Sequence, residues 1–197
     1  MHIDIVKPTG NEMDFIKRSK ELGKKGIAFL YESISKEKVA ELTQLEKSEG
    51  FHILLAKESI GFDNGLRLFD LSSRVDKSRQ LVEKSSNVIF FGFENSQEKD
   101  FSKQRNSGAN HILFKIMKNR GNIFGICTKY IDSKDRISRL RQNLYLCHKY
   151  KVDCCVFTLA NEPLEMRAEN ELFSFLVTVT KNPKLSKSAL SFISTLL

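Results

Sequence analysis

The sequence has no apolar run long enough to cross a membrane. Its longest strongly apolar stretch, VIFFGF at residues 88–93, falls far short of the roughly 20 residues that a bilayer-spanning helix needs. The first ten residues, MHIDIVKPTG, have no basic stretch leading into a long apolar segment, so we expect no secretory signal. These absences predict a cytoplasmic protein without a membrane partner.

Cysteine pairs of the kind that bind zinc or form disulfides are absent too. The four cysteines stand at positions 127, 147, 154 and 155 without CxxC spacing, and neighbours such as Cys154 and Cys155 rarely form a disulfide. Free cysteine packs as a small hydrophobe. We therefore predict reduced thiols in the core.

Nucleotide-binding loops and compact metal motifs are also missing. The ten glycines are scattered, which disfavours a dehydrogenase or an ATPase, and the four histidines form no HExxH motif. One metal site stays open: His2 and Asp4, two residues apart on the first predicted strand, joined by His111. The alternative is a surface His2 beside an inward Asp4, with no metal bound.

Acidic residues are nearly absent from one quarter of the chain. Lys and Arg number 32 and Asp and Glu 24, a net charge of +8. Residues 103–151 hold twelve of the basic residues and only two acidic ones, so the remainder carries 20 basic and 22 acidic residues. The excess is regional, and it favours a polyanionic partner such as RNA. The twelve are Lys103, Arg105, Lys115, Lys118, Arg120, Lys129, Lys134, Arg136, Arg139, Arg141, Lys149 and Lys151; the two acidic residues are Asp132 and Asp135.

Short β-rich runs alternate with helical segments along residues 1–197, without a linker, which predicts a single domain. Strands are predicted at 2–6, 26–31, 51–57, 66–71, 88–93, 122–127 and 154–159, and helices at 11–22, 35–48, 77–86, 109–119, 134–150, 167–180 and 187–196. The three prolines stand next to these elements. Nearly continuous apolar strands between helices are typical of a parallel α/β fold, either an open doubly wound sheet or a barrel. Because no eighth strand follows, a TIM-like (β/α) barrel would be incomplete or distorted.

The helix predicted at 134–150 combines an apolar stripe with a basic flank. The stripe is Ile137, Leu140, Leu144 and Cys147, and the flank is Arg136, Arg139 and Asn143. Planar guanidinium groups on such a flank can bind phosphates through two hydrogen bonds each. The alternative is an ordinary solvated helix face.

The segment before and inside the preceding helix carries further cations. Lys103 and Arg105 precede the helix, and His111 lies in its first turn, where backbone amides are free to bind an anion. Lys115 and Lys118 should extend outward from the same helix. His111 is equally compatible with a structural, hydrogen-bonded role.

Two more arginines follow predicted strands. Arg74 comes after the strand at 66–71, and Arg167 after the strand at 154–159. Both therefore belong to loops at the carboxyl ends of strands, where α/β folds usually bind ligands.

Four blocks of this sequence resemble the archaeal ribonuclease P protein component 3 family. The blocks are RVDKSRQLVEK (74–84), SGANHILFKIMKNRGNIFGI (107–126), RISRLRQNLYLCHKYKVDCCVFTLA (136–160) and NEPLEMRAENELFSFL (161–176). The similarity covers most of the chain and is densest from about residue 67 to 176. Position by position, the NH of an NHxL-like block falls on Asn110 and His111, an RxxxNxxxC-like helix on Arg139, Asn143 and Cys147, and an MR pair on Met166 and Arg167.

The resemblance implies a distorted TIM-like barrel related to the polymerase and histidinol phosphatase superfamily. It implies a protein subunit of the ribonucleoprotein that removes 5′ leaders from precursor tRNA, in which the RNA subunit cleaves and Mg²⁺ serves the RNA-based holoenzyme. The chain itself would have no catalytic residue, metal or cofactor. Its partners would be ribonuclease P RNA, other protein subunits including a small α/β protein, and precursor tRNA as the holoenzyme's substrate.

Metal-dependent members of that superfamily carry His-x-His on the first strand, where this chain has His2-Ile3-Asp4. This departure disfavours the alternative function, a metal-dependent phosphoesterase. The predicted RNA-binding residues are Arg74, Lys103, Arg105, His111, Lys115, Lys118, Arg136, Arg139, Asn143 and Arg167.

Overall fold

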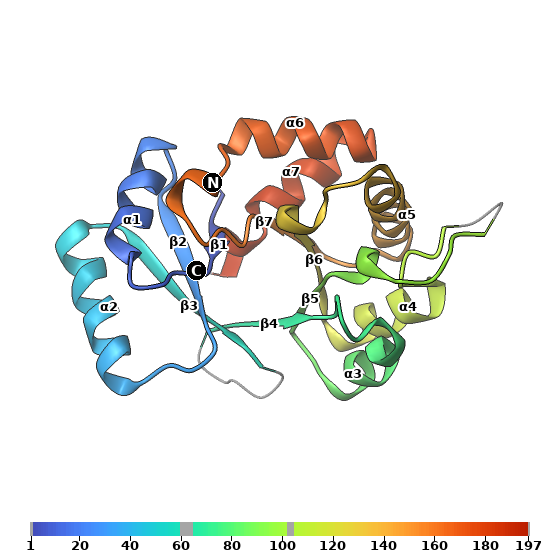
Figure 1. The fold of residues 1–197 in the computed structure, drawn as a ribbon, viewed down its shortest axis with the longest axis horizontal. Coiled ribbons are helices and arrows are strands. Elements are labelled where there is room, and N and C mark those ends of the chain that lie inside the picture. The colour runs from blue at the N-terminus through green and yellow to red at the C-terminus, as the bar shows by residue number, and fades with distance from the viewer. Residues whose placement is uncertain (1, 60–64, 102–104, 197) are drawn as a thin grey trace.

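Seven parallel strands form the centre of the protein in a computed structural model that describes residues 2–59, 65–101 and 105–196. The strands are β1 (Asp4–Val6), β2 (Gly26–Tyr31), β3 (His52–Glu58), β4 (Leu66–Asp70), β5 (Ile89–Phe91), β6 (Ile123–Cys127) and β7 (Cys154–Phe157). They follow one another in sequence order, each paired in parallel with the next (Figure 1). Every predicted strand is present, several of them shortened at their ends.

The helices that connect and cover these strands are α1 (Glu12–Glu21), α2 (Lys36–Glu49), α3 (Ser78–Lys84), α4 (His111–Arg120), α5 (Lys134–Tyr150), α6 (Glu169–Thr180) and α7 (Pro183–Ser191). The prediction that the last helix begins at residue 187 is wrong. Pro183 is the first residue of α7, and the Asn182 side chain accepts a hydrogen bond from the Leu185 N–H as the cap. Proline suits this first position because its missing N–H has no helical partner there.

The sheet curves into a nearly closed barrel. Beyond the end of β7, the Leu159 N–H donates to the Ile5 carbonyl at 2.9 Å, and the Lys7 N–H donates to the Ala160 carbonyl at 2.8 Å. These two bonds join the last strand to the first. The prediction of a distorted TIM-like barrel is confirmed, and the open doubly wound alternative is wrong.

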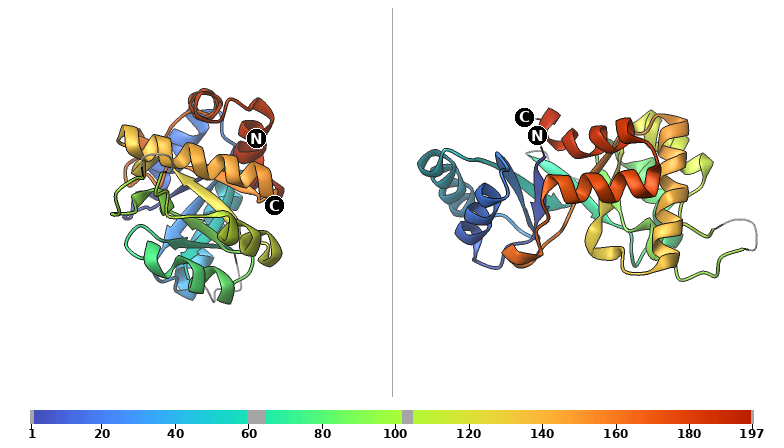
Figure 2. Two further views of the ribbon diagram at one scale, coloured as in Figure 1. Left: turned by 90° about the vertical axis from the view of Figure 1, so that its right-hand side faces the viewer. Right: turned by 90° about the horizontal axis from the view of Figure 1, so that it is seen from above.

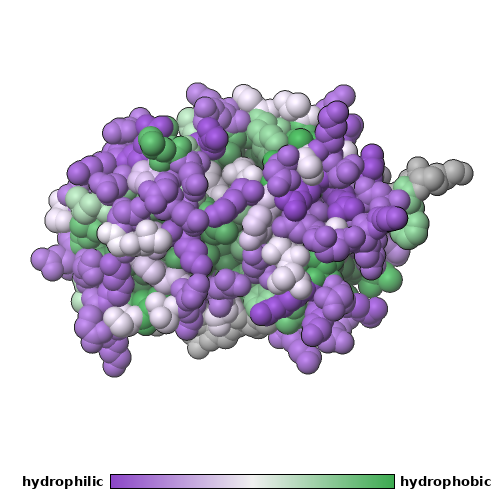
Figure 3. All heavy atoms as spheres, viewed as in Figure 1, coloured by the Kyte–Doolittle hydropathy of each residue, from purple (hydrophilic) through white to green (hydrophobic). Residues whose placement is uncertain are grey.

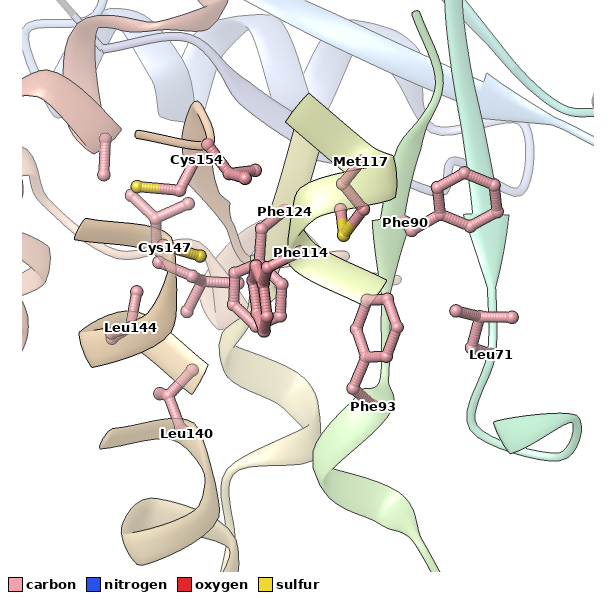
Figure 4. Packing of buried hydrophobic residues seen from close by; sticks show 14 of the residues in the cluster. Leu71, Phe90, Phe93, Phe114, Met117, Phe124, Leu140, Leu144, Cys147 and Cys154 are labelled. Atoms are coloured by element: carbon pink, nitrogen blue, oxygen red, sulfur yellow. The ribbon is translucent and has the colours of Figure 1, made fainter. Parts of the chain in front are cut away.

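Apolar side chains fill the barrel and both outer layers. The interior includes Ile5, Leu30, Leu68, Phe91 and Phe157, joined by Ile193 from the C-terminal turn. Helices α1 and α2 cover one side of the barrel, whereas α3, α4 and α5 cover the opposite side (Figures 1 and 2). On the latter side Phe124 of β6 lies against Phe114 of α4, next to the α5 stripe (Figure 4).

All four cysteines are reduced and buried, as predicted. Cys127 and Cys155 lie in the barrel interior, and Cys147 and Cys154 in the outer layer. Burial raises the pKa of each thiol, to about 12 for Cys154. The thiols are therefore protonated packing groups at neutral pH.

The molecular surface is mostly hydrophilic on the face shown in Figure 3. Among the described residues, no helix combines the length and the apolar character that a membrane crossing requires.

Candidate nucleic-acid interface

The His2 and Asp4 side chains belong to a buried polar cluster. The Lys24 ammonium lies 3.0 Å from His2 Nδ1 and 3.2 Å from Asp4 Oδ2, and the backbone N–H and hydroxyl of Thr158 donate to Asp4 at 2.7 and 3.0 Å. His2 Nε2 lies 3.0 Å from the Val156 carbonyl. Burial, followed by the charge of Lys24, lowers the pKa of His2, so the ring is neutral. A neutral ring can donate a hydrogen bond from Nε2 to the Val156 carbonyl and accept one at Nδ1 from the Lys24 ammonium.

This cluster does not form the metal site that the sequence left open as an alternative. Both ring nitrogens of His2 and both carboxylate oxygens of Asp4 already have hydrogen-bond partners within the protein. His111 is exposed on α4, a different element. No three His, Cys, Asp or Glu side chains within the described ranges lie close enough to hold a metal ion. The predicted surface position of His2 is also wrong, since 1% of the residue is exposed.

Arg139 of α5 is buried rather than displayed on a basic flank. Its Nε donates to Asp100 Oδ1 at 3.0 Å, and its two terminal nitrogens donate to three backbone carbonyls, at distances of 2.5 to 3.3 Å. Those carbonyls belong to Glu94, Ser96 and Glu98. The guanidinium thus holds the 94–100 segment against α5.

Asn143 and Gln142 hold a second segment on the same helix. The fully buried Asn143 amide donates to the Ser107 carbonyl at 3.0 Å. Gln142 accepts from the Arg105 N–H at 3.1 Å and donates to the Arg105 carbonyl at 2.9 Å. The predicted exposed flank is therefore wrong for Arg139 and Asn143, because two chain segments cover it.

The buried face of α5 differs from the predicted apolar stripe, because it includes Arg139 and Asn143 and leaves out Ile137. Leu140, Leu144 and Cys147 are buried as predicted, but Ile137 is 40% exposed. Helical spacing shows which residues share a face, but it does not show which loop will cover that face.

The two segments held by α5 border a groove with a volume of about 800 Å³. We use "the groove" for the cavity lined by residues 72, 73, 75, 76, 78, 95–98, 101 and 105–110, together with Arg136. Serine and asparagine make up eight of its seventeen lining residues. Gly108 is required at its wall: its φ is +71°, and an added Cβ would lie 2.1 Å from the Phe93 carbonyl oxygen.

Several of the predicted cations are paired with carboxylates. The pairs are Arg105 with Asp100 at 3.0 Å and with Asp135 at 3.6 Å, Arg136 with Asp132 at 2.8 Å, and Lys118 with Asp153 at 3.8 Å. Asp100 and Asp153 lie outside residues 103–151, so the count by segment missed them. The regional excess of positive charge found in the sequence is therefore partly neutralised by carboxylates in space.

Other predicted cations have no carboxylate partner among the described residues. Arg74 is exposed, with its guanidinium 5.5 Å from the centre of the Phe69 ring, and Lys115 is exposed, 5.8 Å from the centre of the Tyr150 ring. His111 directly follows Asn110, whose side chain caps α4 by accepting from the Ile112 and Leu113 N–H groups.

The structure gathers some of the predicted residues and separates others. Arg105 and Arg136 line the groove. Arg74 and His111 are neighbours in sequence of its lining residues Ser73, Val75 and Asn110. The exposed Arg167 instead lines a different cavity, of about 340 Å³, beside α6. Lys103 lies outside the described residues.

Glu94 is a titratable residue that sequence patterns did not single out. It is fully buried, and neither carboxylate oxygen has a hydrogen-bond partner within the described chain. Burial, reinforced by the charge of Asp70, raises its pKa to about 7, although Arg136 opposes the shift. Nothing in its sequence context distinguishes it from a surface glutamate of a loop.

The barrel mouth, at the carboxyl ends of the strands, contains a smaller cavity of about 330 Å³. Its lining mixes the cations Lys7 and Lys129 with the carboxylates of Glu58 and Asp70. Asp70 accepts a hydrogen bond from the Tyr130 hydroxyl. The mouth therefore has no strong excess of either charge.

Comparison with known proteins supports the fold. No protein-family model and no curated protein matches the sequence. Among solved structures, a chain in the cryo-EM structure of archaeal ribonuclease P with mature tRNA is similar, with a TM-score of 0.74 and 20% identity over 99% of this chain and 92% of that one. Histidinol phosphate phosphatase from Lactococcus lactis, determined with zinc, L-histidinol and phosphate, has a TM-score of 0.66 and 9% identity over 92% and 93%. At these identities the likeness is one of fold.

Proposed function

We propose that this chain is a protein subunit of ribonuclease P, binding the RNA subunit and supporting removal of 5′ leaders from precursor tRNA. The observation that carries the proposal is the fold similarity to a chain of archaeal ribonuclease P over 99% of this chain. The four sequence blocks that resemble component 3 of the same enzyme support it independently of the fold.

In this proposal the unpaired cations bind RNA phosphates directly. Arg74, Lys115 and Arg167 are exposed, so a phosphate reaches them without breaking an ion pair, and the exposed His111 ring can donate a hydrogen bond to a phosphate. Arg105, Arg136 and Lys118 join them by exchanging or sharing their carboxylate partners, and Lys103 belongs to the same set by its position in the sequence. Each neutralised phosphate releases counterions, which supplies affinity without reading sequence.

Arg139 and Asn143 act indirectly in the same proposal. Arg139 holds the segment whose Asp100 pairs with Arg105, and Asn143 holds Ser107, which lies between Arg105 and His111 in the sequence. Both therefore position residues that touch the RNA. The chain supplies no catalytic group, and Mg²⁺ serves the RNA subunit. Other protein subunits, including a small α/β protein, complete the holoenzyme.

The phosphoesterase alternative has less support. His111 lies on α4, away from His2 and Asp4, and the Lys24 ammonium lies against both His2 and Asp4, where a metal cation would have to bind. We therefore assign the chain no hydrolytic step.

Reconstitution of precursor tRNA cleavage tests the proposal. The RNA subunit and the remaining protein subunits are assayed with and without this chain over a range of Mg²⁺ concentrations. We expect the chain to raise the cleavage rate and to lower the Mg²⁺ concentration required. No stimulation at any Mg²⁺ concentration, with the partner subunits present, would overturn the proposal.

A further inference from the structure

The outer side of α5 carries cations and no carboxylate. Its residues recur every three or four positions, on the side of the helix opposite the buried Leu140 and Leu144. It is distinct from the flank of Arg139 and Asn143, which two chain segments cover. We use "the α5 outer face" for Lys134, Ser138, Arg141, Tyr145, His148 and Lys149.

The cations of this face differ from those of other helices in having no carboxylate partner. Surface cations on three other helices each pair with a carboxylate about one turn away: Arg18 with Glu21 on α1, Lys38 with Glu41 on α2, and Arg79 with Glu83 on α3. Lys134, Arg141 and Lys149 have no ion pair of this kind within the described part of the chain. Asp135 follows Lys134 in the sequence but pairs with Arg105, at 3.6 Å. The α5 outer face therefore keeps its positive charge in the folded protein.

The C-terminal end of this face continues onto α4. The ammonium groups of Lys149 and Lys115 lie 5.7 and 5.8 Å from the centre of the Tyr150 ring. An aromatic ring attracts a cation without neutralising its charge. Positive charge therefore extends from α5 to Lys115, one of the cations proposed above to bind RNA.

The α5 outer face is a ridge rather than a cavity. None of its residues lines the groove, the barrel mouth or the cavity beside α6. In the left view of Figure 2, α5 runs across the side of the molecule that faces the viewer. Lys134 and Lys149 are separated by roughly 22 Å along the helix axis, because each residue adds about 1.5 Å. The cations thus form a line along an exposed rod, which suits an extended partner better than a small ligand.

An extended polyanion with its charges on the outside matches this ridge. Unpaired cations that neutralise phosphates release counterions, which supplies affinity. Double-stranded RNA is recognised by its shape and by its phosphates and 2′-hydroxyls, whereas single strands are recognised by bases that are splayed out and held by the protein. A line of cations without a cavity therefore fits the backbone of an RNA double helix.

We propose that the α5 outer face binds the phosphate backbone of a double-helical RNA segment through Lys134, Arg141 and Lys149. The inference rests on the proposed function for its choice of RNA. It adds a second contact surface to the protein, since none of these three residues belongs to the cations assigned to RNA above. Contacts to phosphates carry no sequence information, so this surface recognises the duplex and not its sequence.

Fluorescence anisotropy with the purified full-length chain tests this surface. The probes are two labelled RNA duplexes of about 16 base pairs with unrelated sequences, one of their single strands, and a poly-glutamate peptide of similar charge. We expect the two duplexes to bind within about twofold of each other, and the single strand and the peptide to bind at least about fivefold more weakly.

A triple variant and a matched control identify the surface. Changing Lys134, Arg141 and Lys149 together to alanine should lower the slope of log K against log salt for the duplex by about 2, and weaken binding on the order of tenfold at about 0.15 M salt. All three side chains are exposed, so the variant should unfold at the same urea concentration as wild type. The control removes the same charge from exposed lysines in or next to the α1–α2 side and should change neither value: Lys25, Lys36 and Lys47 to alanine.

Tyr145→Ala tests the choice of a duplex over a single strand. Tyr145 is 63% exposed in the middle of the face. Because a duplex keeps its bases stacked inside, the ring has no base to stack on, and duplex affinity should stay within about twofold of wild type. A loss as large as that of the triple variant would indicate base stacking and would overturn the inference.

Equal salt slopes for the triple variant and its control would overturn the inference as well, and so would binding of the acidic peptide as tight as that of the duplex. The two proposals fail separately. An unchanged duplex slope with intact stimulation of cleavage contradicts only the α5 outer face. Duplex binding through this face without stimulation of cleavage contradicts only the ribonuclease P assignment.

Discussion

Arg139 shows how one residue of a basic stretch can serve the fold rather than the surface. The sequence context of Arg139 and of the exposed Arg141 is nearly the same, since both lie on one helix among other cations. What separates them is the 94–100 segment, whose carbonyls surround the Arg139 guanidinium. That contact spans about forty positions of sequence, so helical spacing alone could not predict it.

Removing Arg139 should destabilise the protein. Arg139→Ala leaves three carbonyls without their donor and leaves Asp100 with Arg105 as its remaining cation partner. Losing one partner of a buried ion pair costs about 3–5 kcal/mol. We expect a fall of that size in the free energy of unfolding by urea denaturation. Arg141→Ala, two residues further on, should lower it by less than about 0.5 kcal/mol. Equal effects of the two substitutions would contradict the structural role.

Glu94 should make stability depend on pH in one direction. Its pKa rises from 4.5 to about 7 on folding, so its ionisation opposes folding: the contribution is fully favourable below pH 4.5 and is lost as the pH rises through about 7. Glu94→Gln cannot ionise. Its unfolding free energy relative to wild type should therefore increase by about 2–3 kcal/mol between pH 5 and pH 8.

Urea denaturation at the two pH values measures this difference. Glu21→Gln, at an exposed position on α1, is the control and should change the difference little. A gap between Glu94→Gln and wild type that stays constant from pH 5 to pH 8 would contradict the raised pKa.

At the scale of elements, the sequence predicted where strands and helices lie better than it predicted their exposed faces. Helix α5 has the predicted bounds, because Ser133 caps its start and the apolar spacing runs without a break. The start of α7 was missed because Pro183 was interpreted as a boundary, although proline is also favoured as a first helical residue. Ile137 was misplaced because a loop, not the core, covers the neighbouring face.

The turn at Gly108 should tolerate no side chain. Gly108→Ala places a Cβ against the Phe93 carbonyl oxygen in addition to requiring a left-handed backbone. Gly10→Ala has φ +96° but no atom within 4 Å of the added Cβ, so it isolates the backbone cost of about 1–2 kcal/mol. We expect urea denaturation to show a clearly larger loss for Gly108→Ala. A loss no larger than that of Gly10→Ala would mean that the wall of the groove is not packed as described.

At the scale of the whole molecule, the alternation of elements was enough to predict an α/β barrel, but not how it closes. Closure depends on two backbone hydrogen bonds from the chain after β7 to the chain of β1 and just beyond it, more than 150 positions apart in sequence. The distribution of charge in space likewise depends on contacts between residues far apart in the sequence. The local excess in residues 103–151 is real, yet Asp100 and Asp153 from outside that segment neutralise part of it in space. The unpaired cations, rather than the total charge, define the proposed RNA surface.

The salt dependence of binding to ribonuclease P RNA tests this surface most directly. The triple variant of Arg74, Lys115 and Arg167 to alanine is compared with a control triple variant of Lys25, Lys36 and Lys47, exposed lysines in or next to the α1–α2 side, which changes the net charge equally. Each lost phosphate contact should reduce the slope of log K against log salt by about 0.7–0.9, so the first variant should lose about 2 units and the control close to none. Identical slopes for the two variants would contradict the account.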